Sequence, residues 1–152
     1  MDDVASAEPL SLTDDAILQR FLNARNQPTG SQTLGFRMLS VSQATKTVEV
    51  EFEAKAELLL NPMKQIQGGY ICAMLDECMS VACQVASGMT SVAPTLEMKT
   101  SFLQPANAGT RLIVSGHVYH RSSALAFCDG EVRDTEQRLI AKAMGTFKYL
   151  KQ

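Results

Sequence analysis

The sequence predicts an α+β fold in which one long helix packs against a six-stranded antiparallel sheet. Residues 68–86 repeat their apolar side chains with a period of about 3.6, which indicates a helix. Residues 46–54 alternate strictly between apolar and polar side chains, which indicates a half-buried strand. Strand-like segments with short polar breaks follow the helix, and short breaks favour antiparallel neighbours because parallel strands need long crossovers.

The composition is that of one globular domain. The chain has 152 residues, of which 45% are hydrophobic and 20% are charged. We expect residues 1–30 to form an N-terminal extension and residues 31–152 to form the main domain. The 14 basic and 16 acidic residues are spread along the chain, and no basic run could neutralise a series of phosphates. Nucleic acid is therefore not an expected partner.

The sequence also indicates a cytoplasmic protein without membrane association. Its first ten residues contain early acidic side chains and lack the apolar segment of a signal peptide. No apolar stretch approaches the roughly 20 residues that cross a bilayer. The four cysteines form no CxxC pair, so we expect reduced thiols that pack as small core residues, and no zinc site. These cysteines are Cys72, Cys78, Cys83 and Cys128.

A short amphipathic helix is predicted near the N-terminus, at residues 14–25. Thr13 suits the N-cap position, because its hydroxyl can accept a hydrogen bond from a free backbone N–H. Asp14 and Asp15 follow in the first turn, where negative charge is favourable. The first element is therefore an amphipathic helix.

Two strands are expected between this helix and the long one. Pro28 and Gly30 are expected to interrupt the chain before a first strand at residues 34–41. The second strand, at residues 46–54, has its apolar side chains on one face. These side chains are Val48, Val50 and Phe52.

The long helix is apolar over more than one face, so we expect it to be buried. A buried helix needs a curved sheet to cover it. An open sheet has exposed edge strands, and pairing of edges between subunits makes a homo-oligomer, a dimer or a tetramer, the physical expectation. The strands predicted after the helix span residues 95–103, 110–120, 124–134 and 138–150.

The candidate site residues lie around the start of the long helix. Asn61 precedes it, Gln67-Gly68-Gly69 opens it, and Asp76 lies within it. Glycines at a helix N-terminus leave backbone N–H groups accessible to an anion or a developing oxyanion, although a tight turn that needs glycine is the alternative. Asp76 lies off the apolar stripe, which suits either a functional carboxylate or a solvated position beside Glu77.

The spacing between Gly68 and Asp76 restricts how they can act together. Eight residues of helix place them roughly 12 Å apart along the axis. A reacting atom must lie about 3 Å from both the oxyanion donors and the base or nucleophile. If both residues act on one substrate, Asp76 must come from a second copy whose long helix runs antiparallel to the first.

Other chemistry finds little support in the sequence. His117 and His120 are three residues apart on a predicted strand, so we expect them to point to opposite faces. The sequence contains no nucleophile elbow, phosphate loop, dinucleotide fingerprint or metal-ligand cluster. We therefore expect neither a metal nor a cofactor.

Over residues 34–150 the sequence resembles the hotdog-fold acyl-CoA thioesterases of the phenylacetate-degradation type. The family pattern is an Asn, a His-Gly-Gly that opens the central helix, an Asp nine residues after that His, a strand that begins near a Thr, a Phe-Leu-x-Pro-Ala turn and a Gly-Thr-Phe ending. The corresponding residues here are Asn61, Gln67-Gly68-Gly69, Asp76, Thr95, Phe102-Leu103-Gln104-Pro105-Ala106 and Gly145-Thr146-Phe147.

The resemblance implies hydrolysis of an acyl- or aryl-acyl-CoA thioester to free acid and CoA, without a metal. By analogy, Gly68 N–H and Asn61 polarise the thioester carbonyl, while Asp76 of a second subunit activates water or attacks directly with the assistance of Thr95. Gln67 and Gly69 are then substrate-binding residues. The Arg121-Ser122-Ser123 turn could contact CoA phosphates, or it is an ordinary polar hairpin turn.

One residue departs from the family pattern. Gln67 stands where the family usually has His, and an amide can form hydrogen bonds but cannot titrate near neutral pH. A non-catalytic acyl-CoA-binding protein is therefore the alternative function. A dehydratase of the same fold calls for a catalytic His near the helix start, and Gln67 argues against it.

Overall fold

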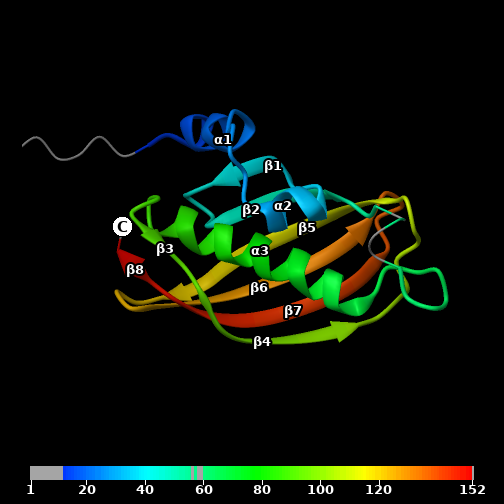
Figure 1. Ribbon diagram of the computed structural model, residues 1–152. Coiled ribbons are helices and arrows are strands. Elements are labelled where there is room, and N and C mark those ends of the chain that lie inside the picture. Colours follow the sequence, from blue (N-terminus) through cyan, green and yellow to red (C-terminus); the bar gives the residue numbers. More distant parts are fainter. Residues whose placement is uncertain (1–11, 56, 58–59, 152) are drawn as a thin grey trace, which may run out of the picture.

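The computed structural model describes residues 12–55, 57 and 60–151. Helix α3 (Gly68–Ala86) packs against one face of a curved six-stranded antiparallel sheet (Figure 1). The strand order is β1-β2-β5-β6-β7-β4. The fold is thus the predicted α+β arrangement. The strands of the sheet are β1 (Arg37–Ser42), β2 (Thr47–Glu53), β4 (Thr95–Phe102), β5 (Arg111–Arg121), β6 (Leu125–Asp134) and β7 (Leu139–Lys148).

Helix α1 (Asp14–Leu22) forms beside β1, and Thr13 caps it as predicted. The Thr13 hydroxyl accepts a hydrogen bond from Ala16 N–H at 3.2 Å. Asp14 ties the helix to the chain after β1, because its carboxylate accepts a hydrogen bond from Gln43 N–H at 3.1 Å. The helix ends at Leu22, three residues before the predicted end.

A second short helix replaces part of the predicted break and strand. Helix α2 (Thr29–Leu34) begins directly after Pro28, and Gly35 ends it in a left-handed conformation with φ of 70°. Proline is tolerated at a helix start, where its missing N–H has no helical partner in any case. The prediction of a strand from residue 34 was therefore wrong, and β1 begins at Arg37. The division of the chain at residue 30 stays a prediction.

The core lies between α3 and the sheet. The alternating side chains Val48, Val50 and Phe52 of β2 are fully buried, as predicted. Gly116 of β5 allows a close approach of the two layers, because a Cβ atom there would lie 3.0 Å from the backbone oxygen of Cys78. The bounds of α3 agree with the prediction at both ends.

Three of the four cysteines pack in this core, as the sequence predicts. Cys78, Cys83 and Cys128 are buried, Cys72 is half-buried, and all four are free thiols. Burial raises the pKa of the Cys78 thiol. A hydrogen bond with Cys83, together with burial, raises the pKa of Cys128. Thiols with raised pKa values are poor nucleophiles, so these side chains act in packing.

A two-stranded ladder that the sequence did not predict joins the end of the chain to the segment after α3. Strand β3 (Ser91–Val92) pairs with β8 (Leu150–Lys151). Lys148 N–H donates to the Pro94 carbonyl at 2.9 Å, and the Tyr149 hydroxyl donates to the Cys83 carbonyl at 3.0 Å. The last predicted strand, at residues 138–150, is therefore divided into β7 and β8.

The two histidines of β5 lie on one face of the sheet, which corrects the expectation of opposite faces. His117 pairs with Asp129, and His120 pairs with Phe127, two residues earlier on β6. A bulge between Val118 and His120 inserts one extra residue on β5, so the side chains of His117 and His120 point to the same face of the sheet. Nδ1 of the His117 ring lies 3.1 Å from Oδ1 of Asp129, within hydrogen-bond distance, on this exposed face.

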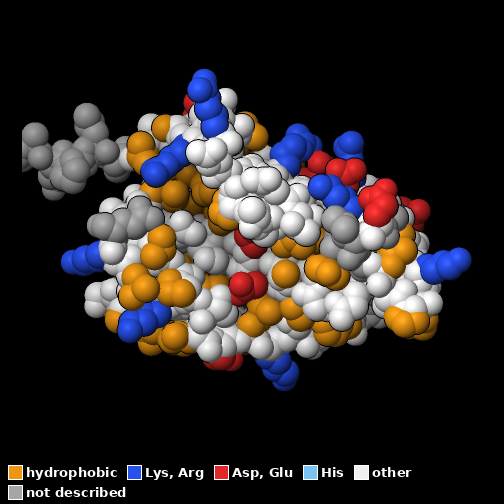
Figure 2. Space-filling view, in the orientation of Figure 1, with side chains coloured by type: hydrophobic (Ala, Val, Ile, Leu, Met, Phe, Trp, Pro, Cys, Tyr) orange, Lys and Arg blue, Asp and Glu red, His pale blue; other side chains and the backbone are white. Residues whose placement is uncertain are grey.

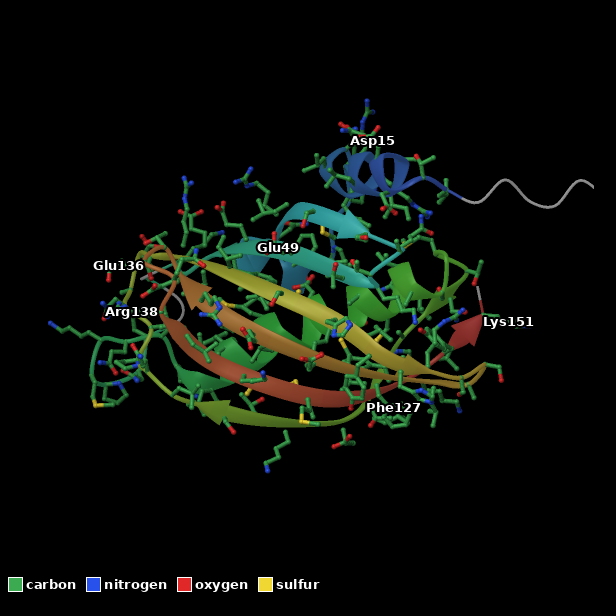
Figure 3. The ribbon with its side chains drawn as sticks, turned by 180° about the vertical axis from the view of Figure 1, so that it is seen from behind. Asp15, Glu49, Phe127, Glu136, Arg138 and Lys151 are labelled. Atoms are coloured by element: carbon green, nitrogen blue, oxygen red, sulfur yellow. The ribbon has the colours of Figure 1, made fainter. Side chains whose placement is uncertain are left out.

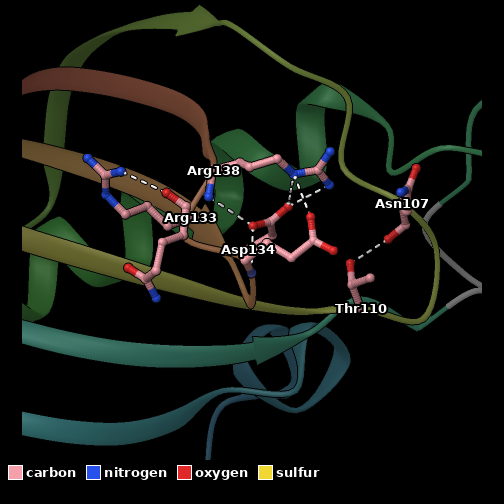
Figure 4. Close-up of polar contacts among 7 residues, drawn as sticks. Asn107, Thr110, Arg133, Asp134 and Arg138 are labelled. Carbon is pink, nitrogen blue, oxygen red and sulfur yellow. Dashed lines mark hydrogen bonds and ion pairs between the residues drawn. The ribbon is translucent and has the colours of Figure 1, made fainter.

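The turn between β6 and β7 is organised by Asp134. Its carboxylate accepts hydrogen bonds from the backbone N–H groups of Glu136 and Arg138 and forms a 2.7 Å ion pair with the Arg138 guanidinium (Figure 4). Burial acts to raise the pKa of Asp134, but the hydrogen bonds from Arg138 outweigh it, so this pKa lies below its usual range. The turn lies at the end of the sheet where α3 begins.

Strand β4 is an edge of the sheet, since it pairs only with β7 within it. Leu96 and Phe102 on this strand are 56% and 55% exposed. An exposed edge with large apolar side chains is a surface that proteins usually cover. In the described ranges, no helix combines the length and the apolar character that a membrane span requires.

Candidate active site

The N-terminus of α3 presents one unused backbone donor. Gln67 is the N-cap, and its side-chain oxygen accepts a hydrogen bond from Gly69 N–H at 2.9 Å. The Gln67 carbonyl accepts from Tyr70 N–H at 2.9 Å. Gly68 N–H meets no acceptor among the residues that the structure describes. This N–H lies at the positive end of a 19-residue helix, where it can stabilise an oxyanion.

Asn61 adds a second donor, its side-chain Nδ2 group, which is left available because the side-chain oxygen closes a turn. Its side-chain oxygen accepts hydrogen bonds from Met63 N–H at 2.9 Å and Gln65 N–H at 3.0 Å. An asparagine that closes a turn in this way has a fixed amide orientation, because only the oxygen can accept. The Nδ2 group of Asn61 is therefore the part left to meet a ligand.

Asn61 and Gly68 line the same cavity. It has a volume of about 340 Å³ and lies between the start of α3, the turn at Asn61 and the end of β4. Phe102 covers Gly68 so closely that a Cβ atom on Gly68 would lie 3.2 Å from the ring. The structure thus brings Asn61 and Gly68 together and adds an aromatic wall from the Phe-Leu-x-Pro-Ala segment.

Asp76 lies elsewhere on the helix, with Thr95. The Thr95 hydroxyl, at the start of β4, donates a hydrogen bond to the Oδ1 atom of Asp76. Asp76 is half-buried and does not line the cavity at Gly68. Because eight residues of helix separate Gly68 from Asp76, about 12 Å along the axis, one chain does not bring the donors and this carboxylate together.

Glu77 is a second carboxylate that the sequence did not single out. It accepts a hydrogen bond from the Ser31 hydroxyl of α2, whereas Asp76 accepts its hydrogen bond from the Thr95 hydroxyl of β4. Burial raises the pKa of Glu77, the bond from Ser31 opposes this, and the charge of Asp76 raises it further. No sequence signal could identify the contact, because Ser31 lies 46 residues away.

The exposed face of α3 is hollowed between the N-terminal segment and β4. Figure 2 shows acidic side chains in this hollow over α3, whose acidic residues are Asp76 and Glu77. They point to opposite flanks of the helix, one toward β4 and the other toward α2.

The Arg121-Ser122-Ser123 turn is far from Gly68 in the same chain. Ser122 closes it, since its hydroxyl accepts hydrogen bonds from Ala124 N–H at 3.2 Å and Leu125 N–H at 3.0 Å. The turn lies at the end of the sheet near the C-terminus of α3. Figure 3 shows this separation: Phe127, next to the turn, is at the opposite end from Arg138.

Where the structure describes side chains, it contains no group of three or more His, Cys, Asp or Glu residues placed to hold a metal ion. The candidate site therefore consists of backbone N–H groups, one amide, one hydroxyl and carboxylates. Such a set can polarise a carbonyl group and supply a base or a nucleophile.

The fold is found in many solved structures. A phenylacetic acid degradation-related protein from Ralstonia eutropha JMP134 is 27% identical, with a TM-score of 0.78 and coverage of 86% of this chain and 98% of that one. The Escherichia coli PaaI protein from the phenylacetic acid degradation operon is 21% identical, with a TM-score of 0.74 and coverage of 82% and 86%. A Streptococcus mutans protein bound to acetyl-CoA is 24% identical, with a TM-score of 0.66 and coverage of 77% and 90%.

A comparison with curated protein sequences gives no match. The family model described as "Thioesterase superfamily" matches residues 65–141, which include the start of α3, Asp76, Thr95 and most of the sheet. The fold is the hotdog fold that the motifs predict. This chain belongs to the thioesterase superfamily.

Proposed function

We propose that this protein is an acyl-CoA thioesterase that hydrolyses an acyl- or aryl-acyl-CoA to a free acid and CoA. The observation that carries this proposal is that Asn61 and Gly68 line one cavity at the start of a helix, and that Gly68 N–H and Asn61 Nδ2 meet no acceptor among the described residues. Two donors in one cavity at the positive end of a helix suit a carbonyl oxygen that gains negative charge in the transition state.

The reaction follows from the chemistry of these groups. The thioester oxygen accepts hydrogen bonds from Gly68 N–H and Asn61 Nδ2. Asp76 of the partner subunit removes a proton from water, which attacks the carbonyl carbon, or its carboxylate attacks that carbon directly. The carbon–sulfur bond then breaks, and CoA leaves as a thiolate that takes up a proton. After direct attack the acyl group is bound to Asp76 as an anhydride, which water hydrolyses to release the acid and restore the carboxylate. Thr95 keeps one oxygen of Asp76 in place and leaves the other for the reaction.

Gln67 and Gly69 determine which backbone N–H group at the start of α3 is left to bind the substrate. Because Gln67 binds Gly69 N–H, the turn into α3 is fixed, and Gly68 N–H is the donor that remains. A Cβ atom on Gly69 would lie 2.7 Å from the Gln67 side-chain oxygen, so a side chain there would displace the Gln67 amide from this hydrogen bond. An amide is sufficient for this positioning role, so His is not required for it.

The shared site requires a homo-oligomer, which is either a dimer or a tetramer. The open edge of β4 and its exposed apolar side chains support pairing at this edge. Antiparallel α3 helices that place Gly68 level with Asp76 of the partner subunit have their two-fold axis near residue 72. The free thiols support the expected cytoplasmic location, where thiols stay reduced.

The Arg121-Ser122-Ser123 turn belongs to this proposal as a site for CoA phosphates. In the antiparallel arrangement the C-terminal end of the partner's α3 lies about 15 Å beyond the level of Gly68. The partner's turn lies near that end, so a CoA molecule that extends in this direction brings its phosphates to the turn. The binding of acetyl-CoA by the Streptococcus mutans neighbour supports an acyl-CoA as the ligand.

A non-catalytic acyl-CoA-binding protein is the second candidate function. Gln67 favours it, because an amide at this position supplies no titrating group near the carbonyl. Both functions use the same cavity and the same donors. They differ in whether Asp76 carries out chemistry.

The test is CoA release from a panel of aryl-acetyl, short, medium and long acyl-CoAs, followed with a thiol reagent. Wild type and Asp76→Asn are compared, since this substitution keeps the shape of the side chain and removes its charge. Turnover by wild type that disappears in Asp76→Asn supports the thioesterase. Turnover that persists in the variant refutes the role of Asp76, and acyl-CoA binding without turnover establishes the binding protein.

A further inference from the structure

A second cavity lies on the flank of α3 that faces away from β4. It has a volume of about 270 Å³ and lies between the helix and the segment of residues 21–36. Figure 1 shows α2, which belongs to this segment, on the side of α3 opposite β4. The cavity shares no lining residue with the one at Gly68, so a molecule bound in it would not occupy the proposed reaction site of the same chain.

Glu77 is the charged group of this cavity. Glu77, Val81 and Gln84 follow one another at helical spacing, so one face of α3 forms the floor. No described residue that lines the cavity is Lys, Arg or His, and none of the ion pairs among the described residues includes Glu77. Arg20 lines only the adjoining hollow at Gln84, roughly 10 Å from Glu77 along the helix axis. The negative charge of Glu77 is therefore left without a cation in this cavity.

The hydrogen bonds of the cavity leave one oxygen of Glu77 without a donor. The buried Ser31 donates to Oε1, and no described residue donates to Oε2. The Ser80 hydroxyl donates elsewhere, to the Ala93 carbonyl at 2.8 Å. Burial raises the pKa of Glu77 in spite of the bond from Ser31, because the charged form is poorly solvated. A ligand that brings a positive charge and an N–H donor would compensate this carboxylate.

A tie between α2 and α3 does not by itself call for a carboxylate. A glutamine at position 77 could accept the same hydrogen bond from Ser31, and it would avoid the cost of a half-buried charge. The charge is thus the feature of Glu77 that the contact with Ser31 leaves unexplained, and a cationic ligand accounts for it.

The walls of the cavity suit an apolar body attached to that cation. Phe21 and Phe36 line it, with ring centroids 6.1 Å apart, and aromatic rings attract cations through their faces. A cavity of about 150 Å³ already holds a benzene ring, so this one accepts a ring with a short chain. A bare metal ion fits less well, because it needs several oxygen ligands, and the described side chains form no cluster that could hold one.

We propose that this cavity binds a small organic ammonium ion, a primary amine on a ring or a short chain, with its charged end at Glu77 and its apolar end against Phe21 and Phe36. The ammonium group donates one hydrogen bond to Oε2 of Glu77. The side-chain amides of Asn26 and Gln84 also line the cavity and can accept its remaining hydrogen bonds. This site goes beyond the proposed thioesterase reaction and does not depend on it.

The test measures Kd by calorimetry at pH 8 for three amines and for the alcohols of the same shape. The pairs are benzylamine and benzyl alcohol, 2-phenylethylamine and 2-phenylethanol, and hexylamine and 1-hexanol. Wild type should bind at least one amine about tenfold more tightly than its alcohol, since an ion pair adds to the hydrogen bond that the alcohol can also form. Glu77→Gln should bind the two members of that pair with similar Kd values. Equal Kd values in wild type for every pair, or no binding of any amine, would overturn the inference.

Two further variants separate Glu77 from the general charge of the helix and from folding. Asp76→Asn removes the neighbouring carboxylate, which is turned toward β4, and should change the preference for the amine less than twofold. Gln84→Glu adds a second carboxylate to the cavity without touching the bond between Ser31 and Glu77, and it should increase that preference. A preference lost equally in Asp76→Asn and Glu77→Gln would mean that the cavity does not select the amine.

The binding test and the CoA-release test have independent outcomes. CoA release without amine binding refutes only this inference. Amine binding without CoA release refutes only the proposed thioesterase.

Discussion

The hydroxyl of Thr95, at the start of the edge strand, donates a hydrogen bond to Oδ1 of Asp76 on the central helix. This bond ties the helix to the edge of the sheet at the level of the carboxylate. It also restricts the rotation of the Asp76 side chain, so one carboxylate oxygen keeps a fixed direction. The orientation of Asp76 thus depends on a residue 19 positions later in the sequence.

Replacing Thr95 tests whether this positioning matters to the reaction. Thr95→Val keeps the shape of the side chain and loses the donor, so we expect kcat to fall about tenfold, the usual scale of a hydrogen bond to a charged group. Thr95→Ser keeps the hydroxyl and should retain most of the activity. Steady-state kinetics on the best substrate measures both, and equal losses in the two variants would contradict a role for the hydroxyl.

The two functions of Asn61 can be separated. Asn61→Asp keeps an oxygen that accepts from Met63 and Gln65 N–H, but loses Nδ2, so kcat should fall about 10²- to 10³-fold while Tm changes little. Asn61→Ala loses both functions, so both kcat and Tm should fall. An Asn61→Asp enzyme with wild-type kcat would show that Nδ2 does not act on the carbonyl.

Glu77 should make the protein less stable as pH rises, the opposite of the usual effect of a carboxylate. Its folded pKa is raised, so the folded protein binds this proton more tightly than the unfolded chain does. The stability that this proton contributes is fully present below the pKa of Glu77 in the unfolded chain, about 4.3, and is lost as pH rises through the pKa of Glu77 in the folded protein. We therefore expect Glu77→Gln, which can still accept from Ser31, to have a higher Tm than wild type at pH 8, with a difference that shrinks toward pH 4.

Glu131 provides a control of opposite sign for this measurement. Hydrogen bonds from Lys142 and Arg133 lower the pKa of Glu131. Its contribution to stability is present above the unfolded value and is lost as pH falls through the folded pKa. Glu131→Gln should therefore have a lower Tm than wild type at pH 8 and approach it in acid. Parallel pH profiles for the two variants would contradict these assignments.

Gly116 should be intolerant of a side chain. A Cβ atom there would lie 3.0 Å from the Cys78 carbonyl oxygen and 3.2 Å from the Ala82 side chain, so Gly116→Ala forces the helix and sheet apart. We expect a loss of about 1–3 kcal/mol in the free energy of unfolding, measured by denaturant titration. Gly30→Ala is the control, since nothing lies within 4 Å of its Cβ position on α2 and alanine favours helix.

The antiparallel arrangement of α3 predicts a cross-link. Position 72 lies midway between Gly68 and Asp76, and the side chain of Cys72 turns toward Thr100, with 3.6 Å between the sulfur and the hydroxyl. Ala73, on the exposed face, is therefore the better site. In a Cys72→Ser background, Ala73→Cys should form a disulfide-linked dimer on mild oxidation, seen on a non-reducing gel. Gln84→Cys should not form this dimer. A disulfide at position 84 and none at position 73 would indicate another register of the two helices.

The regular elements were predictable because their patterns are local. Helix α3 begins at the glycine pair and ends before Ser87, where its apolar period stops, and β2 follows strict alternation. Helix α2 escaped prediction because Pro28 indicates a break unless it is known to stand at a helix start. Strands β3 and β8 are two residues long, too short to show a period. The bulge after Val118 has no pattern in the sequence.

The candidate site was predictable in part for the same reason. Asn61 and Gly68 meet in one cavity because a short turn and a helix start hold them, and the motif spacing contains both. The pairing of Thr95 with Asp76 came from the family resemblance rather than from periodicity. The contact of Ser31 with Glu77 depends on how α2 packs over α3, and side-chain packing between distant segments leaves no periodic signal.

The ladder between β3 and β8 has a consequence for the order of events in the cell. Pro94, directly before Thr95, accepts its hydrogen bond from Lys148, and β3 pairs with residues 150 and 151. The ribosome adds these residues after every residue of the candidate site. A nascent chain can form α3 early, but the strand that places Thr95 beside Asp76 gains its partners only when this last segment has emerged. The contact between Thr95 and Asp76 is therefore fixed only after residues 148–151 have been synthesised.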